Sequence, residues 1–335
     1  MRANTWQSVG SIGPPLTVLV SWKNYLLATG GICMAAKFLL QVLKDLNWRF
    51  VVRGTIVFLV GLFALTPVAL GILLMPVVGQ PIYDRLIFQP LKYPSGRYEK
   101  LAVKGIAPEE IFFKSKNGNK LHGLMYALPL AKKVVLLSHG NSGNISQRGH
   151  LVDLLLKDGV SVFVYDYAGY GRSEGKVAME TLVQDGRSAY NYLTRERHLR
   201  AEEIILFGES LGTLVTGKLA QSVQCAAVIL ECPLYSLRRV GCDKLPYLSL
   251  YPDWAWSNSC KQLDISMAMN KKRSPVLLIA GTSDNLTRIK QADELYAAIA
   301  APKAYIRIEG AQHGDAVMMK SKEYKEGLRD FIASL

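Results

Sequence analysis

The chain has 335 residues, enough for one large domain and an additional segment, and half of these residues are hydrophobic. Its net charge of +13 is concentrated near the N-terminus, because residues 1–104 contain 11 Lys and Arg against 3 acids, whereas the remaining 231 residues contain 29 against 24. No arginine-rich stripe or RNA-binding motif accompanies this charge, so we expect no nucleic-acid partner. The five cysteines lack a C-x-x-C pattern and indicate neither a disulfide framework nor a zinc site, so we expect no metal.

An apolar region occupies the N-terminal part of the chain. Residues 55–78 form a run of 24 residues without a charged side chain, long enough to cross a bilayer. An earlier apolar stretch, residues 25–43, contains Lys37 and is either a second span or a helix lying in the interface. We therefore expect residues 1–80 to form a membrane region with one or two passes, whose basic side chains meet anionic headgroups.

The basic residues around this region also predict its orientation. Six Lys and Arg precede residues 55–78, against three in the twenty residues that follow. If residues 25–43 also span, the short loop after them contains Lys44, Arg49 and Arg53. Both arrangements place the basic segment in the cytoplasm and the C-terminal part of the chain on the non-cytoplasmic side.

The rest of the chain has the pattern of an α/β domain. Residues 81–107, with prolines and interleaved charges, are typical of a linker, and two strands with a turn at Asn117-Gly118 follow. Helix-length segments then alternate with six apolar runs: KVVLLSHG, GVSVFVYDY, EEIILFGE, CAAVILE, PVLLIAG and KAYIRIEG. This pattern predicts a mainly parallel sheet over residues 108–335, covered by helices on both faces.

Two segments match the pattern G-x-S-x-G. Ser173 follows its strand only after a loop and is typical of a polar loop residue. Ser210 lies directly between the strand-like run IILF and the helix-like run LGTLVTGKLA. This context is typical of a nucleophile elbow, in which flanking glycines allow neighbouring chains to approach and the helix N-terminus favours negative charge. We therefore predict that Ser210 is a nucleophile.

A serine nucleophile needs a base, and in this architecture the order along the chain is serine, acid, histidine. His313 is the histidine that follows Ser210, just after the final predicted strand. Asp284, at the end of the run PVLLIAGTSD, is the preferred acid, because it can orient and stabilise a protonated imidazole there. The other candidate acids are Glu231, as the reserve, and Asp253 and Asp264.

The negative oxygen that develops during acyl transfer needs donors that are already in place. One expected donor is the backbone N–H of Leu211, the residue after the nucleophile. The other is expected in the loop SHGNSGN, where we choose the N–H of Asn141. We expect His139 in the same loop to support its conformation rather than to transfer protons.

With these residues, the chain resembles an α/β-hydrolase over about residues 108–335. The resemblance rests on SHGNSGNISQRG, VYDYAGYGRSEG, FGESLG, LLIAGTSD and GAQHGD, in this order. It is similar to the membrane-anchored branch related to serine aminopeptidases, which includes lysophospholipid lipases and acyl-protein thioesterases. This resemblance implies a Ser-His-Asp triad of Ser210, His313 and Asp284 that acts without a cofactor. One departure is NLTRIK after the acid, where the family often has a short hydrophobic-proline turn, so the conformation of this loop is not predicted.

The combined expectation is a membrane-anchored serine hydrolase that cleaves carboxylic ester or thioester bonds of a lipid or another acyl-bearing small molecule. A short lid is expected over about residues 233–273, with LPYLSLYPDWAW as an apolar wall. The alternatives are a serine peptidase of the same fold and a membrane-tethered binding protein without turnover. Deletion of residues 1–80 is expected to preserve hydrolysis of a soluble ester and to lower hydrolysis of a vesicle-borne substrate.

Overall fold

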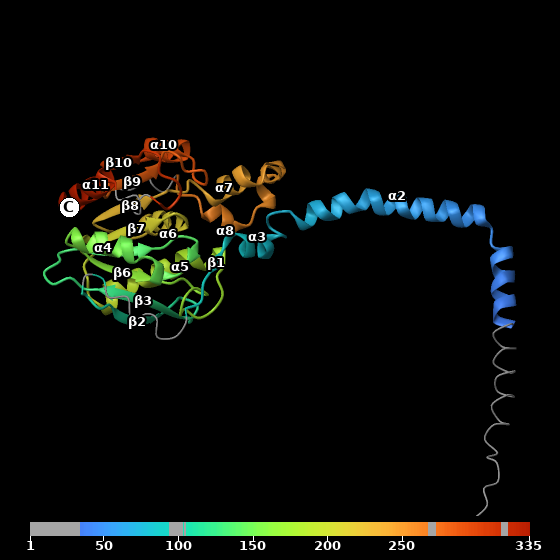
Figure 1. Cartoon of the computed structure of the whole chain (residues 1–335), viewed down its shortest axis with the longest axis horizontal. Helices are drawn as coiled ribbons and strands as arrows, with labels where there is room; N and C mark the ends of the chain where they lie inside the picture. Colours follow the sequence, from blue (N-terminus) through green and yellow to red (C-terminus); the bar gives the residue numbers. More distant parts are fainter. Residues whose placement is uncertain (1–33, 94–102, 104, 267–272, 316–320) are drawn as a thin grey trace, which may run out of the picture. The chain divides into compact units, whose positions relative to one another are not determined.

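The chain divides into two units, residues 1–71 and 72–335 (Figure 1). The computed structural model describes residues 34–93, 103, 105–266, 273–315 and 321–335. In the first unit, residues 34–45 are helical, and helix α2 (Trp48–Leu73) follows and ends just inside the second unit. Among the described residues, α2 is the one helix long and apolar enough to cross a membrane, and none of its residues is buried. It covers most of the predicted span 55–78, whereas residues 25–33 of the possible second span lie outside the described residues.

The second unit is built on an eight-stranded sheet with the order β10-β9-β8-β7-β4-β6-β3-β2. Neighbouring strands from β10 to β6 are parallel, and β3 pairs antiparallel with both β6 and β2. The strands are β2 (Glu109–Lys114), β3 (Lys120–Tyr126), β4 (Val134–Ser138), β6 (Ser161–Tyr165), β7 (Ile204–Glu209), β8 (Ala227–Glu231), β9 (Val276–Gly281) and β10 (Lys303–Ile308). All six apolar runs predicted as strands therefore belong to this sheet, and the N-terminal hairpin turns at Gly118, with φ of 84°.

Helices connect these strands and cover both faces of the sheet. They are α4 (Gly149–Lys157), α5 (Met179–Asn191), α6 (Leu211–Ala220), α10 (Ile289–Ala298) and α11 (Lys322–Ala333), with short helical turns η2 (Ile145–Gln147), η3 (Tyr192–Glu196) and η4 (Ala201–Glu203) between them. Successive side chains of a strand point to opposite faces, so the buried side chains form two cores. In β7, Leu206 packs in one core with α5 and α6, whereas Phe207 packs in the other with α4 and α11. This is the predicted α/β architecture.

Ordered elements also occupy the stretches expected to be a linker and a lid. In the first, helix α3 (Gln80–Ile87) leads into β1 (Gln89–Pro90), which pairs in parallel with β5 (Ser142–Gly143). In the second lie α7 (Leu237–Lys244), η5 (Pro246–Leu250), η6 (Asp253–Ala255) and α8 (Asn258–Gln262). Figure 1 shows α3, α7 and α8 together at one end of this unit. They border the carboxyl ends of the parallel strands, where sites form in open α/β sheets.

Candidate active site

Ser210 lies in a sharp turn between β7 and α6. Its φ of 51° and ψ of −118° are unusual for a residue with a side chain, so the turn is strained. The flanking glycines are required by close backbone contacts. A Cβ atom on Gly208 would lie 2.5 Å from the carbonyl oxygen of Gly212, and one on Gly212 would lie 1.9 Å from the carbonyl oxygen of Ser138. The chain thus brings the serine hydroxyl to the N-terminus of α6, as the elbow pattern predicts.

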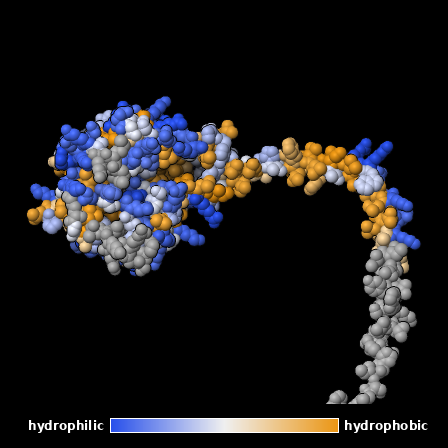
Figure 2. Space-filling view, viewed as in Figure 1, coloured by the Kyte–Doolittle hydropathy of each residue, from blue (hydrophilic) through white to orange (hydrophobic). Residues whose placement is uncertain are grey.

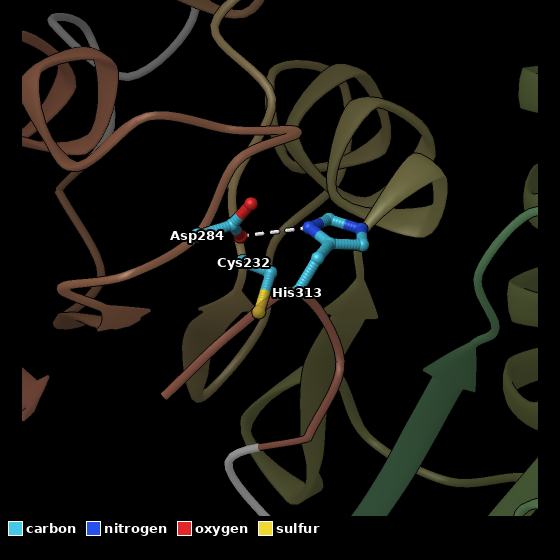
Figure 3. Close-up of side chains that lie close together, drawn as sticks. All are labelled: Cys232, Asp284 and His313. Carbon is cyan, nitrogen blue, oxygen red and sulfur yellow. Dashed lines mark hydrogen bonds and ion pairs between the residues drawn. The ribbon is translucent and has the colours of Figure 1, made fainter. Parts of the chain in front are cut away.

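Ser210, His313 and Asp284 form a hydrogen-bonded row. The Oγ of Ser210 lies 2.6 Å from Nε2 of His313, and Nδ1 of the same ring lies 2.7 Å from Oδ2 of Asp284. Figure 3 shows the second bond as a dashed line, with the other ring nitrogen at the far side of the imidazole. With Nδ1 donating to the carboxylate, Nε2 is left as an acceptor that faces the serine hydroxyl. This geometry allows His313 to take the proton of Ser210.

The loop after β9 holds the carboxylate of Asp284. Its Oδ1 accepts the backbone N–H groups of Leu286 and Thr287 at 2.7 and 2.8 Å, and its Oδ2 accepts the hydroxyl of Thr287 at 2.6 Å. Burial acts to raise the pKa of Asp284, but the hydrogen bonds from His313 and Thr287 outweigh burial and keep this pKa below its usual range. The segment NLTRIK, which differs from the pattern of the family, therefore forms a turn whose N–H and hydroxyl groups bind the ionised carboxylate of Asp284.

The loop from His139 to Gly143 passes beside Ser210. A Cβ atom on Gly140 would lie 3.4 Å from the Cβ of Ser210, and Asn141 lines the same cavity as Ser210 and Leu211. The carbonyl of Asn141 accepts a 2.7 Å hydrogen bond from the hydroxyl of Tyr170. Asn141 and Leu211, whose N–H groups are the expected oxyanion donors, therefore line the same cavity as Ser210.

His139 lies beneath this loop and faces away from the solvent. Its side chain is fully buried, its Nδ1 is 2.7 Å from the carbonyl of Gly140, and Nε2 is 3.6 Å from Oδ1 of Asp166. Burial lowers the pKa of His139 to about 4, so the ring is neutral near pH 7. These contacts fit a structural role for His139, as expected from the sequence.

Sequence similarity to known proteins identifies the family of this chain. The family model of the serine aminopeptidases S33 matches residues 129–257. The mouse α/β-hydrolase domain-containing protein 17C is 32% identical over 230 residues, which cover 68% of each chain. The chain belongs to the α/β-hydrolase superfamily. An uncharacterised Mycobacterium tuberculosis protein is 29% identical to this chain, over 74% of this chain and 86% of its own length. The structure of the Pyrococcus furiosus esterase Pf2001 has the same fold, with a TM-score of 0.60. It is 18% identical and covers 74% of this chain and 98% of its own.

The other candidate acids of this α/β-hydrolase have different partners. Glu231, at the end of β8, accepts a 2.9 Å hydrogen bond from the hydroxyl of Tyr324. Asp253 is exposed and pairs with Arg238 and Lys261, and Asp264 accepts from the N–H and hydroxyl of Ser266. Within the described residues, the carboxylate that hydrogen-bonds to His313 is therefore that of Asp284.

The second G-x-S-x-G segment lies away from the His313 side chain. The hydroxyl of Ser173 donates to the carbonyl of Asp166 at 2.7 Å and accepts the N–H of His122 at 2.9 Å. Ser173 is almost fully buried, with 2% of its surface exposed. This hydroxyl fixes a loop of the α/β-hydrolase fold, in agreement with the sequence interpretation.

Cys232, one of the five cysteines, is a neighbour of His313 that was not among the site residues predicted from the sequence. Its Sγ lies within 4.8 Å of ligand atoms of Asp284 and His313, so the three residues are a possible metal-binding group (Figure 3). The sulfur accepts the N–H of Gly314 at 3.5 Å, and burial, with Glu231 nearby, raises the pKa of the thiol well above its usual value. Through the hydrogen bond from Gly314, Cys232 supports the loop that carries His313. Its position directly after a buried strand was the signal in the sequence.

A largely apolar cavity of about 410 Å³ opens beside Ser210. Its walls come from segments that are far apart in the sequence: α3, the start of α5, α7, η5 and the residues around α8. The residues that line it include Tyr83, Leu86, Ile87, Met179, Leu234, Leu237, Val240, Leu245, Leu248, Trp256 and Leu286. Such a cavity can bind the apolar part of a substrate whose reacting carbonyl lies at Ser210.

Proposed function

We propose that this chain is a membrane-anchored serine hydrolase that cleaves carboxylic ester or thioester bonds through an acyl-enzyme. The observation that carries the proposal is the hydrogen-bonded row of Ser210, His313 and Asp284, whose serine lines an apolar cavity. A serine, a histidine or an acidic residue does not by itself indicate a function. A 2.6 Å contact between the serine Oγ and the histidine Nε2, at a strained turn between strand and helix, is an arrangement suited to acyl transfer.

In the proposed mechanism, Nε2 of His313 takes the proton of Ser210 as Oγ attacks the substrate carbonyl carbon. The backbone N–H groups of Leu211 and Asn141 stabilise the negative oxygen that develops. The ionised carboxylate of Asp284 stabilises the imidazolium, which then gives its proton to the departing alcohol or thiol. Water, deprotonated by the same imidazole, releases the acyl group and restores the serine.

The cavity favours an acyl substrate over a peptide with a free N-terminus. An aminopeptidase needs a carboxylate to bind the substrate ammonium, and the residues that line the cavity include no Asp or Glu in the part of the chain that the structure describes. Its apolar walls fit an acyl chain instead. The Pyrococcus relative in fold is named an esterase, which agrees with this choice.

Helix α2 is the proposed anchor, since its 26 residues are sufficient to cross a bilayer. The hydrolase unit is then proposed to lie on the non-cytoplasmic side, as the distribution of Lys and Arg around the span indicates. Protection of the C-terminal unit from protease added to the outside of intact cells would contradict this orientation.

A fluorophosphonate probe tests the proposed chemistry, because it reacts covalently with an activated serine. We expect wild-type chain to be labelled and Ser210→Ala to remain unlabelled. Ser173→Ala, which changes the second G-x-S-x-G segment, is the matched control and should still be labelled if it folds. A panel of esters, thioesters and aminoacyl amides then ranks the substrates. Well-folded wild type that fails to label would favour the binding-protein alternative.

A further inference from the structure

Exposed apolar side chains gather at the end of the hydrolase unit that contains α3, η5 and η6 (Figure 2). We call six of them the apolar rim: Val77, Val78, Ile82, Leu86, Leu250 and Trp254. Leu250 and Trp254 are 82% and 71% exposed. Large apolar groups that cluster on a surface mark interaction sites more often than isolated ones do.

Direct contacts hold the parts of the apolar rim together. The hydroxyl of Tyr83 in α3 lies 3.2 Å from that of Tyr247 in η5, and the N–H of Val77 donates to the carbonyl of Ala255 in η6 at 2.8 Å. These two bonds join two segments into one surface. The first segment contains Val77 and α3, and the second, more than 150 residues later in the sequence, contains η5 and η6.

The apolar rim borders the mouth of the cavity beside Ser210. Leu86 belongs both to the rim and to the cavity lining, and Leu248 lines the cavity two residues before Leu250. A molecule that enters past the rim therefore contacts apolar side chains from the surface to the serine.

The rim also lies close to the proposed span along the chain. Val77 is the fourth residue after Leu73, the last residue of α2, so the two Cα atoms are at most about 14 Å apart. In addition, the carbonyl of Leu74 accepts a 2.6 Å hydrogen bond from Tyr83, which fixes the residue after the helix to α3. Where α2 leaves a bilayer, the rim is within reach of the headgroups.

The polar groups at the rim fit a lipid interface. Asp253, which precedes Trp254, pairs with Arg238 and Lys261, so its charge is compensated. Trp side chains are preferred at the depth where headgroups meet acyl chains.

We propose that the apolar rim docks on the bilayer that α2 crosses, and that a lipid-borne acyl chain enters the cavity between α3 and η5 without crossing water. This inference rests on the proposed function for the fate of the acyl chain, but not for the docking itself.

Quenching of tryptophan fluorescence by brominated lipids tests the docking without any need for activity. The full-length chain is reconstituted in vesicles of phosphatidylcholine and phosphatidylglycerol, with or without phosphatidylcholine brominated near the start of the acyl chains. The difference between wild type and Trp254→Phe reports Trp254, and Leu130→Trp, in the exposed loop before β4, is the matched control. We expect strong quenching of the Trp254 contribution and weak quenching of the contribution that Leu130→Trp adds. Equal quenching of the two would overturn the proposal.

Turnover tests the entry of the acyl chain. The double variant Leu250→Ser/Trp254→Ser should hydrolyse a long-chain ester in vesicles about tenfold more slowly, with a soluble short-chain ester unchanged within about twofold, because neither side chain lines the cavity. Leu130→Ser removes a fully exposed leucine from the loop before β4, at the amino ends of the parallel strands, and should change neither rate. If the double variant matches wild type on vesicles, the acyl chain does not enter by the rim. Absence of turnover in wild type would reject the proposed function and leave the quenching result to decide the docking.

Discussion

At the scale of single residues, the acid determines how the proposed triad works. Asp284 accepts hydrogen bonds from His313, from the hydroxyl of Thr287 and from two backbone N–H groups, so its carboxylate is fixed and ionised. Glu231 is placed just as close to the sheet edge but is buried against Tyr324. Burial, with Glu209 nearby, raises the pKa of Glu231 to about 8. The two carboxyl groups thus differ in charge near neutral pH, and the ionised one faces the imidazole.

Removal of the Asp284 charge should therefore slow the reaction far more than removal of the Glu231 carboxylate. Asp284→Asn is expected to lower kcat by about 10,000-fold, because the amide cannot stabilise the imidazolium and favours the wrong tautomer of His313. Glu231→Gln should keep kcat within about tenfold, since the carboxyl group is already protonated near pH 7. Steady-state kinetics on one soluble ester measure both. Equal losses in the two variants would contradict this assignment of the acid.

Glu231 should also make the stability of the fold depend on pH. Its pKa rises from 4.5 to about 8 on folding, so the folded chain retains a proton that the unfolded chain releases between these values. Stability from this group is therefore complete below pH 4.5 and falls as the pH rises towards 8, by an upper limit of about 5 kcal/mol. Glu231→Gln mimics the protonated form and avoids this loss.

We accordingly expect the Tm of Glu231→Gln to exceed that of wild type at about pH 9 and to match it at about pH 4. Differential scanning fluorimetry of both chains in the same detergent measures the difference. A Tm difference that does not change with pH would show that folding does not raise the pKa of Glu231.

The residues of the proposed triad could be predicted from the sequence, whereas their supports could not. Ser210, Asp284 and His313 each follow a strand with a clear apolar pattern, so parallel pairing places them at one edge. Thr287 acts through the conformation of the loop after Asp284, which the apolar patterns of the strands do not predict. The bond of Glu231 to Tyr324 joins residues 93 positions apart.

At the scale of elements, the segment after α3 is part of the candidate site. The N–H of Leu91 donates to the carbonyl of Gly143 at 3.0 Å, and the side-chain Nδ2 of Asn144 donates to the carbonyl of Leu91 at 3.0 Å. The N–H of Gln89 lies 3.3 Å from Oδ1 of Asn141. This short ladder holds the loop that would bind the oxyanion. Its strands have two residues each, too few for a periodic pattern, so the sequence indicated only a linker here.

Loss of one ladder hydrogen bond should slow the chemical step while substrate binding is preserved. Leu91→Pro removes the N–H that donates to Gly143, and Leu91→Ala removes the same exposed side chain but keeps the N–H. We expect kcat to fall about tenfold in Leu91→Pro, with KM within about twofold, because a small displacement of an oxyanion donor weakens stabilisation of the transition state. Leu91→Ala should match wild type. Similar kcat values for the two variants would show that the ladder does not position the loop.

At the scale of the whole molecule, the boundary between the two units lies earlier in the chain than the end of the deletion considered from the sequence. The second unit begins at Ile72, and Pro76 and Gln80 already line the cavity. Val77 also forms a backbone hydrogen bond with η6, and the carbonyl of Leu74 accepts a hydrogen bond from Tyr83 in α3. A deletion of residues 1–80 therefore removes part of the cavity wall as well as the anchor, and its expected neutrality towards a soluble ester no longer holds.

Two truncated chains separate these effects. A chain that starts at Ile72 should hydrolyse a soluble short-chain ester within about twofold of the full-length rate, because it retains the complete second unit. A chain that starts at Pro81 lacks two lining residues and should lose at least about tenfold on the same ester. On a long-chain ester in vesicles, the chain from Ile72 should also fall about tenfold, because it has lost the effective concentration that a tether provides. Circular dichroism and size-exclusion chromatography establish that both chains are folded and monodisperse. If the chain from Pro81 is as active on the soluble ester as the chain from Ile72, residues 72–80 are only a connection to the anchor.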